Sequence, residues 1–274
     1  MQIQCKDFNL QTTLESGQVF GFAKGVQGSY SGMLHGSSVE VVQKNGHLDV
    51  RGKVSARVIR DYFDLNRDLS SVYAILAEDP VLAPLRTYIK GLRLIRQDSW
   101  EALACFIISS NNNVKRIAGI HRNLCEYFAR RRGDLDGRPF PSAQEIARSS
   151  EKVLRDLGLG YRAPFLWATA MFLSNNPGYL DAVREAEHEE AVERVLAFPG
   201  IGPKVADCVL LYGFHRLEFF PVDVWIARIV TKLYFKGRRV PEERIRRFGM
   251  KRWGADAGYV QQYLFHGSRT GVIK

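Results

Sequence analysis

Apolar and polar residues alternate in the first fifty positions of the chain. Apolar residues occupy every second position in Val39–Val41 and again in Leu48–Val50, as in strands that bury one face. Asn45 and Gly46 stand between these segments, and this pair favours a two-residue hairpin turn. Residues 1 to about 53 therefore predict a small β-rich unit.

From about residue 54 the apolar positions follow a helical period instead. Ile59, Tyr62 and Phe63 share one helical face, and the same spacing recurs further along the chain. Another apolar helix is expected to begin at Ser99, a candidate N-cap, and to end before the asparagines at 111–113. For those asparagines, a polar loop between two helices is the simplest interpretation.

The most informative stretch runs from residue 196 to residue 226. A Pro-Gly-Ile-Gly turn leads into an apolar helix, and Pro203 occupies the position where the first helical turn begins. Gly200 and Gly202 allow a tight turn whose amides point outward, which is a common anion site. An acidic segment over 187–196 precedes the turn and predicts the first helix of a pair.

Two charged residues in this stretch suggest chemistry. Lys204 lies in the first turn of the predicted helix, beside the anion site, and Asp223 is a lone carboxylate in an apolar, aromatic run. Their placement suggests amine chemistry close to a phosphate backbone. A glycine turn before a helix is common by itself, so the hypothesis depends on the lysine and the aspartate.

The amino-acid composition also favours a polyanionic binding partner. The 274 residues carry a formal net charge of +10, and the pI is about 9.5. No run reaches the roughly 18 apolar residues of a membrane helix, and the first ten residues do not form a signal peptide. The cysteines at 5, 105, 125 and 208 have no metal-ligand spacing, so free thiols in a reducing interior are expected.

The segment PGIGPKVADC, followed by PVDV, resembles the helix-hairpin-helix DNA glycosylases in their 8-oxoguanine glycosylase branch. The resemblance implies an α+β fold, with a small N-terminal antiparallel β-rich (TBP-like) domain that includes the first helices over 1–85, and a mostly helical domain over 86–274. The helix-hairpin-helix is expected at about 187–214. The implied partner is double-stranded DNA containing 8-oxoguanine, and no cofactor or metal is expected.

The resemblance also implies a set of base-recognition residues. Gly17, in a Ser-Gly-Gln-Val-Phe segment, would accept a hydrogen bond from N7–H of the oxidised base through its carbonyl. Gln261 would read the Watson–Crick edge and Phe265, four residues on, would stack on the flipped ring. Cys208 would line the pocket, although a small buried hydrophobe explains it too.

Further residues are implied to hold the DNA itself. Asn111 would fill the hole left by the extruded nucleotide, Tyr161 would wedge into the stack, and Arg116 and Arg162 would contact the orphaned cytosine. The phosphate-binding residues are implied at the hairpin and just after the aspartate: Gly200, Gly202, Val205 and Trp225. Trp225 stands where the animal enzymes have a histidine, so phosphate handling is expected to differ there.

The implied enzyme is a bifunctional N-glycosylase and DNA-(apurinic or apyrimidinic site) lyase. Lys204 would attack the sugar C1′, Asp223 would stabilise the developing positive charge, and β-elimination would follow. Two alternatives stay open: a related glycosylase for another damaged base, and a non-catalytic DNA-binding module. A monomeric cytoplasmic protein, bacterial or archaeal and nucleoid-associated, is expected.

Overall fold

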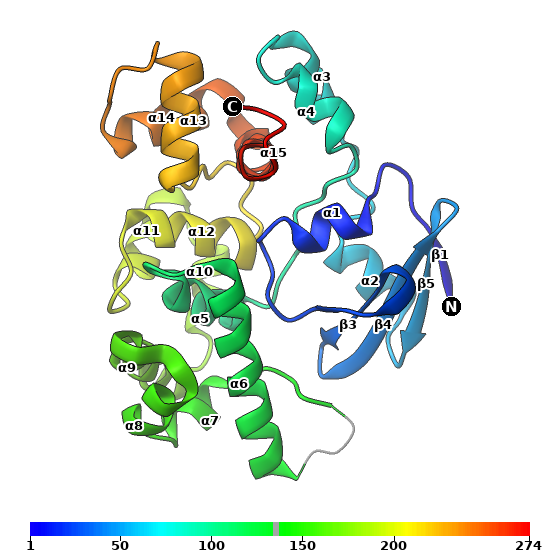
Figure 1. The fold of residues 1–274 in the computed structure, drawn as a ribbon. Helices are drawn as coiled ribbons and strands as arrows, with labels where there is room; N and C mark the ends of the chain where they lie inside the picture. Colours follow the sequence, from blue (N-terminus) through cyan, green and yellow to red (C-terminus); the bar gives the residue numbers. More distant parts are fainter. Residues whose placement is uncertain (134–136) are drawn as a thin grey trace.

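The N-terminal part of the chain is a five-stranded antiparallel sheet (Figure 1). The structure, a computed structural model, describes residues 1–133 and 137–274. The strands lie in the order β1-β5-β4-β3-β2. Their bounds are β1 (Gln2–Gln4), β2 (Ala23–Lys24), β3 (Ser29–Leu34), β4 (Ser37–Lys44) and β5 (His47–Gly52). The predicted hairpin is confirmed: Asn45 and Gly46 join β4 to β5 with φ of 46° and 80°.

One face of the sheet is buried and the other is largely open. Val39 and Val41 point inward from β4 and lie opposite Gly52 and Val50 of β5, so the alternation in the sequence predicted the buried face correctly. The inward side chains pack with α1 (Leu10–Glu15) and α2 (Ala56–Tyr62) to form a small apolar core. This core therefore belongs to the first 65 residues, together with Ile95.

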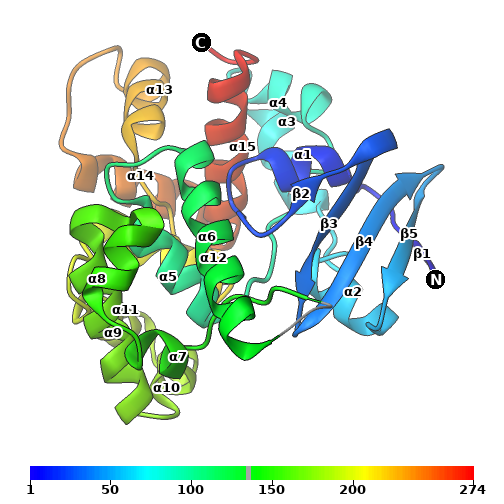
Figure 2. The same cartoon turned by 60° about the horizontal axis from the view of Figure 1, so that its bottom comes forward.

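The rest of the chain is helical and has a second, larger core (Figure 2). The helices are α3 (Ser70–Glu78), α4 (Ala83–Tyr88), α5 (Ser99–Ser109), α6 (Val114–Arg132), α7 (Ala143–Ala147), α8 (Glu151–Leu154), α9 (Ala163–Asn175), α10 (Tyr179–Glu185), α11 (His188–Leu196), α12 (Pro203–Gly213), α13 (Val224–Tyr234), α14 (Glu242–Trp253) and α15 (Ala257–Thr270), with short turns η1 (Val26–Gly28), η2 (Arg155–Leu159), η3 (Gly160–Arg162) and η4 (Gly254–Asp256). Helix α15 lies between α13 and α14 on one side and α3 and α4 on the other, in both views.

The start of α5 corrects one expectation. Ser99 is the first helical residue, and the N-cap is Asp98, whose carboxylate accepts a hydrogen bond from the amide of Glu101 at 2.9 Å. Aspartate caps at least as well as serine, and its charge also interacts favourably with the positive end of the helix. The helix therefore begins where the sequence predicts, with a different residue capping it.

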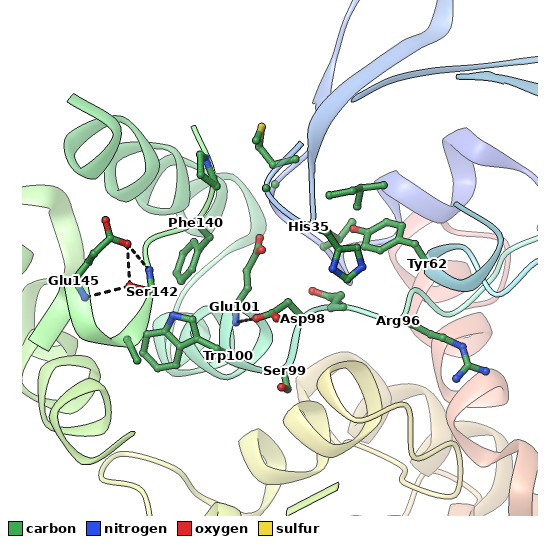
Figure 3. Close-up of a pocket in the computed structure, with 18 of the residues that line it drawn as sticks. His35, Tyr62, Arg96, Asp98, Ser99, Trp100, Glu101, Phe140, Ser142 and Glu145 are labelled. Atoms are coloured by element: carbon green, nitrogen blue, oxygen red, sulfur yellow. Dashed lines mark hydrogen bonds between the residues drawn. The ribbon is translucent and has the colours of Figure 1, made fainter. Parts of the chain in front are cut away.

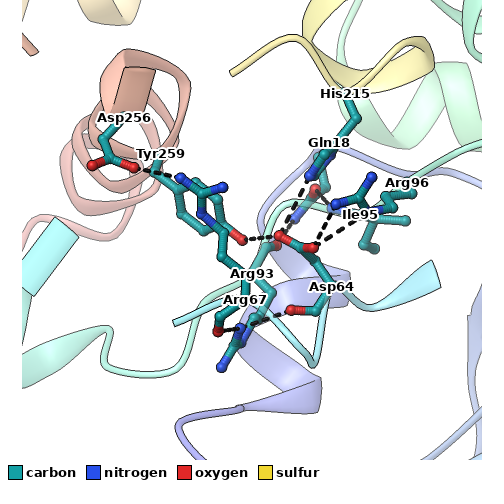
Figure 4. A network of polar contacts seen from close by, with 9 residues as sticks. All are labelled: Gln18, Asp64, Arg67, Arg93, Ile95, Arg96, His215, Asp256 and Tyr259. Carbon is teal, nitrogen blue, oxygen red and sulfur yellow. Dashed lines mark hydrogen bonds and ion pairs between the residues drawn. The ribbon is translucent and has the colours of Figure 1, made fainter. Parts of the chain in front are cut away.

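A buried polar network joins the two parts of the molecule (Figure 4). Asp64, 4% exposed, accepts hydrogen bonds from Arg96 at 3.0 Å and from the Tyr259 hydroxyl at 2.9 Å, and it lies 3.4 Å from His215. Burial disfavours the charged carboxylate, but these partners outweigh it and hold the pKa of Asp64 below its usual value. The network thus ties residues after α2 to α15 and to the loop after α12.

A buried cation, Arg93, fixes the loops near the N-terminus. The Arg93 guanidinium, 2% exposed, donates to four backbone carbonyls, among them those of Asp64 at 2.7 Å and Asp7 at 3.1 Å. Arginine suits this position because its five donors can satisfy several loop carbonyls at once. These bonds position the segment that precedes Gly17.

Candidate active site

The helix-hairpin-helix is formed by α11 and α12, as the sequence predicts. Gly200 has φ of +77°, and a Cβ there would lie 2.5 Å from the Phe165 ring, so only glycine fits this turn. Pro203 is the first residue of α12, and the first helical hydrogen bond is made by Ala206 to the Gly202 carbonyl at 2.9 Å. The amides just before Ala206 are thus left pointing out of the helix end, as an anion site requires.

Asp223 caps the next helix and faces the same region. Its Oδ1 accepts hydrogen bonds from the amides of Trp225 at 3.0 Å and Ile226 at 2.9 Å. The backbone bonds to Oδ1 hold the carboxyl in one orientation at the start of α13. Within the described part of the chain, the other oxygen, Oδ2, accepts no hydrogen bond and can take a different partner.

These residues meet at one cavity of about 600 Å³. The residues of the sequence prediction that line it come from four separate parts of the chain: Gly17, Lys204, Cys208, Asp223, Trp225, Gln261 and Phe265. Lys204 is half-buried at its edge. The structure thus brings together the Lys204 amine, the Asp223 carboxylate and the Phe265 ring, in a space large enough for a small ligand.

The loop that carries Gly17 is fixed by the last helix. The Ser16 carbonyl accepts hydrogen bonds from Gln262 Nε2 at 3.2 Å and from Arg269 Nη1 at 3.2 Å. Gln18 is buried and holds the other side of the loop, donating to the Arg93 carbonyl at 2.8 Å and accepting from the Ile95 amide at 2.8 Å. Gly17 itself has φ of +87°, so its direction depends on glycine.

Arg269 completes this side of the cavity. Its guanidinium lies 5.2 Å from the centre of the Phe265 ring and lines the cavity. Partial burial lowers the pKa of Arg269 from its ordinary value, with Asp223 acting in the opposite direction. One cation therefore joins the Ser16 carbonyl to the aromatic ring, and it links the two sides of the cavity.

The wall opposite is a set of buried polar and aromatic side chains. Gln261 Nε2 donates to the Pro221 carbonyl at 3.1 Å, which ties α15 to the segment that carries Asp223. The Tyr212 hydroxyl lies 3.3 Å from Gln261 Oε1 and contacts Gln262 as well, and its ring stacks on Phe106 at 5.2 Å. The Gln261 amide, which is buried and lines the cavity, is thus held in one orientation.

The position of α12 is fixed from behind. Asp207, 1% exposed, accepts two hydrogen bonds from Arg246 of α14, at 2.6 and 3.0 Å. Burial raises the pKa of Asp207, and the paired guanidinium counteracts that rise. On the cavity side of the same helix, burial raises the pKa of Cys208 to about 11, so its thiol stays protonated at neutral pH.

The residues expected to meet the opposite base lie beside the cavity and form a unit of their own. Asn111 and Arg116 are exposed, and Tyr161 is 48% exposed, with its hydroxyl donating to the Ser110 carbonyl at 3.1 Å. Arg162 is 2% exposed and donates to the Ser110 and Asn111 carbonyls. Its guanidinium also lies 4.3 Å from the Tyr161 ring.

The reason for this inward orientation is local. The turn after α5 leaves carbonyls without helical partners, and a planar guanidinium satisfies several of them at once. Arg162 therefore fixes the turn that presents Asn111, and a direct contact with cytosine stays a prediction.

A second cavity, of about 660 Å³, lies between the sheet and the start of α5 (Figure 3). It is lined by Tyr62, Trp100 and Phe140 and by charged side chains that include Glu101 and Glu145. None of the residues predicted from the sequence as site residues lines it. We therefore place the candidate active site in the first cavity.

Comparison with known proteins identifies the family. The model of the 8-oxoguanine DNA glycosylase N-terminal domain matches residues 1–103, and the model of HhH-GPD superfamily base excision DNA repair proteins matches residues 104–255. The chain belongs to the 8-oxoguanine DNA glycosylase family. The predicted family and fold class, an antiparallel sheet followed by a helical domain, are thereby confirmed.

Individual relatives cover most of the length of the chain. An N-glycosylase/DNA lyase of Saccharomyces cerevisiae is 34% identical over 259 residues, which cover 78% of this chain and 68% of the yeast protein. A probable N-glycosylase/DNA lyase of Methanothermobacter thermautotrophicus is 31% identical, in an alignment that covers 100% of this chain and 97% of the archaeal protein. The Clostridium acetobutylicum 8-oxoguanine glycosylase/lyase, solved with dsDNA containing cytosine opposite 8-oxoG, superposes with a TM-score of 0.89 at 29% identity, covering 100% and 99% of the two chains.

Sequence reasoning missed two cations of this glycosylase's cavity. Arg269 lies one helical turn after Phe265, so the spacing that placed Gln261 and Phe265 on one face could have included it. Lys115 follows the asparagine run and carried no separate signal. In the described part of the chain, no helix is both long and apolar enough to span a bilayer. The described residues also contain no group of three or more His, Cys, Asp or Glu side chains suited to a metal ion.

Proposed function

We propose that this protein flips 8-oxoguanine out of duplex DNA and excises it as a bifunctional N-glycosylase/DNA lyase. The observation that carries the proposal is the meeting of Lys204 and Asp223 at one cavity, which also has a fixed Gly17 loop and the Phe265 ring. Family membership supports the reaction class. A duplex base must leave the stack before its glycosidic bond is accessible, and a cavity of this size can receive it.

The chemistry follows from the two charged residues. Lys204 Nζ, in its unprotonated form, adds to the sugar C1′ while the bond from C1′ to the base breaks, and the base leaves with the electron pair and takes up a proton. Positive charge builds on the sugar as this bond breaks, and the Asp223 carboxylate stabilises it. The covalent amine then ring-opens to a Schiff base, and loss of a proton from C2′ expels the 3′ phosphate.

Base discrimination is assigned to the Gly17 carbonyl. Normal guanine presents a lone pair at N7, which a carbonyl oxygen repels, whereas 8-oxoguanine presents N7–H, which it accepts. Gln262 and Arg269 hold the adjacent Ser16 carbonyl, so the direction of the Gly17 peptide is set before the base arrives. Phe265 provides the stacking surface, Gln261 reads the Watson–Crick edge, and Cys208 lines the pocket.

The remaining site residues are assigned to the duplex. Asn111 and Tyr161 fill the space left by the flipped nucleotide. Arg116 and Arg162 contact the orphaned cytosine, and Arg162 also holds the turn that carries Asn111. Gly200, Gly202 and Val205 surround the amides that bind a phosphate, and Trp225 borders it. We expect faster excision opposite cytosine than opposite the other three bases, and equal rates opposite all four would refute this part.

The decisive experiment is borohydride trapping on a duplex that contains one 8-oxoguanine opposite cytosine. Wild type should give a covalent protein–DNA adduct, and Lys204→Gln should give none. Lys115→Gln is the matched control, because Lys115 lines the same cavity and should keep the adduct. An adduct in Lys204→Gln would overturn the assignment of the nucleophile.

Other outcomes separate the alternatives. Base loss without an adduct, visible as cleavage after hot alkali, would indicate a monofunctional glycosylase. Retained DNA binding with neither product would leave a different lesion or a non-catalytic module. We include in the proposal that the enzyme acts as a monomer in the cytoplasm of a bacterium or archaeon, associated with the nucleoid; sedimentation of the purified protein tests the first point.

A further inference from the structure

A positively charged groove continues from the candidate active site along α13. The groove has a volume of about 860 Å³ and lies between α13 and the connection to α14. Arg228, Lys232 and Arg239 line it, and Glu242 is its one acidic residue. Val224 lines both the groove and the candidate active site. The two spaces are therefore adjacent at the start of α13.

The cations of this groove lie on the exposed surface of α13 and of the segment that follows it. Among the described residues, Arg228, Lys232 and Arg239 have no carboxylate within ion-pair distance, and all three are exposed. The neighbouring arginines of α14 differ, because Arg246 and Arg252 are paired with aspartates at 2.6 and 3.0 Å. Clustered cations without partners repel one another, and a polyanion that lies among them relieves this repulsion.

Trp225 positions the cation nearest to the active site. The Arg228 guanidinium lies 5.6 Å from the centre of the Trp225 ring, one helical turn away. Trp225 lines the active-site cavity, is 38% exposed, and has no charge of its own. An arginine on the face of an indole is held by electrostatic attraction and loses less side-chain freedom when it binds a phosphate.

We propose that Arg228, Lys232 and Arg239 bind consecutive backbone phosphates of the DNA strand beside the flipped nucleotide, with Trp225 positioning Arg228. This inference rests on the proposed function. Arg228 and Lys232 are four residues apart on α13, so about 6 Å of helix separates them along the axis, and they can contact different phosphates of one strand. The positive charge that Trp225 lacks is thus provided one turn further along the helix.

Salt dependence of binding tests the groove. Fluorescence anisotropy on an undamaged duplex, from 0.05 to 0.3 M salt, gives the slope of log Kd against log salt. Each phosphate contact contributes about 0.9 to this slope. Arg228→Gln should lower it by about 1, and the triple variant Arg228→Gln, Lys232→Gln, Arg239→Gln by two to three, with a loss of affinity of about fivefold per contact at 0.15 M salt.

The control is Arg86→Gln. Arg86 is an exposed arginine of α4 that lines neither the active-site cavity nor the groove, and its variant should keep the wild-type slope. Wild-type slopes in the triple variant, with a wild-type melting temperature, would overturn the proposal. Two variants of Trp225 test its positioning role. Trp225→Phe keeps an aromatic ring beneath Arg228 and should keep the wild-type slope, whereas Trp225→Ala removes the ring and should lower the slope. Equal slopes for both would overturn the positioning role.

Failure of the groove is distinguishable from failure of the reaction. Trapping in wild type together with unchanged slopes would refute the groove alone. Lowered slopes without any adduct on 8-oxoguanine DNA would support the groove as a DNA-binding surface and refute the proposed reaction.

Discussion

The substitution Gly17→Ala tests the base pocket most directly. Gly17 has φ of +87°, and a Cβ there would lie 2.6 Å from Arg269 Nη1 and 3.3 Å from Phe265 Cε1. The new methyl group would therefore collide with both side chains that close this side of the cavity. The loop has to move, or Arg269 has to leave the Ser16 carbonyl.

The expected magnitude follows from these two costs. An alanine in the left-handed region costs about 1–2 kcal/mol. Losing the charged hydrogen bond between Arg269 and the Ser16 carbonyl costs about 1.5–3 kcal/mol. If the loop relaxes to avoid this strain, the Gly17 carbonyl no longer points where N7–H would be. We expect 8-oxoguanine excision to fall by about 30-fold or more, which corresponds to about 2 kcal/mol.

The assay separates the base from the sugar chemistry. Single-turnover excision of 8-oxoguanine should fall, whereas strand cleavage at a preformed abasic site should stay within about threefold of wild type, because no base is recognised there. Gly28→Ala is the matched control, since Gly28 has φ of +75° and its Cβ would meet nothing within 4 Å. Parallel losses on both substrates in Gly17→Ala, or a comparable loss in Gly28→Ala, would refute the reasoning.

Three further predictions concern charge and burial. The Asp223→Asn variant keeps an oxygen that can cap α13, so its unfolding free energy should stay near that of wild type, whereas Asp223→Ala should lose about 1 kcal/mol. Both variants should excise 8-oxoguanine at least about 10²-fold more slowly, because the carboxylate charge is gone. An active Asp223→Asn would refute the electrostatic role. Burial disfavours a charged His121, but hydrogen bonds with Cys125 and Glu101 outweigh it and raise the pKa of His121 to about 10. The contribution of charged His121 to the free energy of unfolding is therefore complete below about pH 6.5 and is lost as the pH rises towards 10. In urea unfolding, the stability difference between wild type and His121→Gln should shrink across that range. A constant difference would contradict the prediction. Finally, because burial raises the pKa of Cys208 to about 11, iodoacetamide at pH 8 should leave Cys208 unmodified in the native protein and label it in urea, as read by mass spectrometry.

Local patterns in the sequence predicted the elements that depend on few neighbours. The hairpin at Asn45 and Gly46 and the Pro203 start of α12 follow from backbone preferences that act within a few residues. In both cases the deciding forces are local. The expectation that Lys204 and Asp223 act together came instead from the family resemblance, and both residues line the same cavity.

What the sequence left out depends on contacts between distant residues. Arg269 meets the Ser16 carbonyl across 253 positions, and no spacing rule connects them. The Arg162 guanidinium donates to the Ser110 and Asn111 carbonyls across 52 and 51 positions, which no local pattern indicated, and its contact with cytosine stays a prediction. Side chains of α3 and α4 join the larger core of the helical part, so the proposed domain boundary at residue 85 stays a prediction.

The closure of the Gly17 loop by α15 has a consequence for how local unfolding and base recognition are linked. The Ser16 carbonyl accepts hydrogen bonds from Gln262 and Arg269, across 246 and 253 positions of the chain. The same helix carries Gln261, which donates to the Pro221 carbonyl just before Asp223. Local opening of α15 would therefore release the Gly17 loop and the segment that carries Asp223 together.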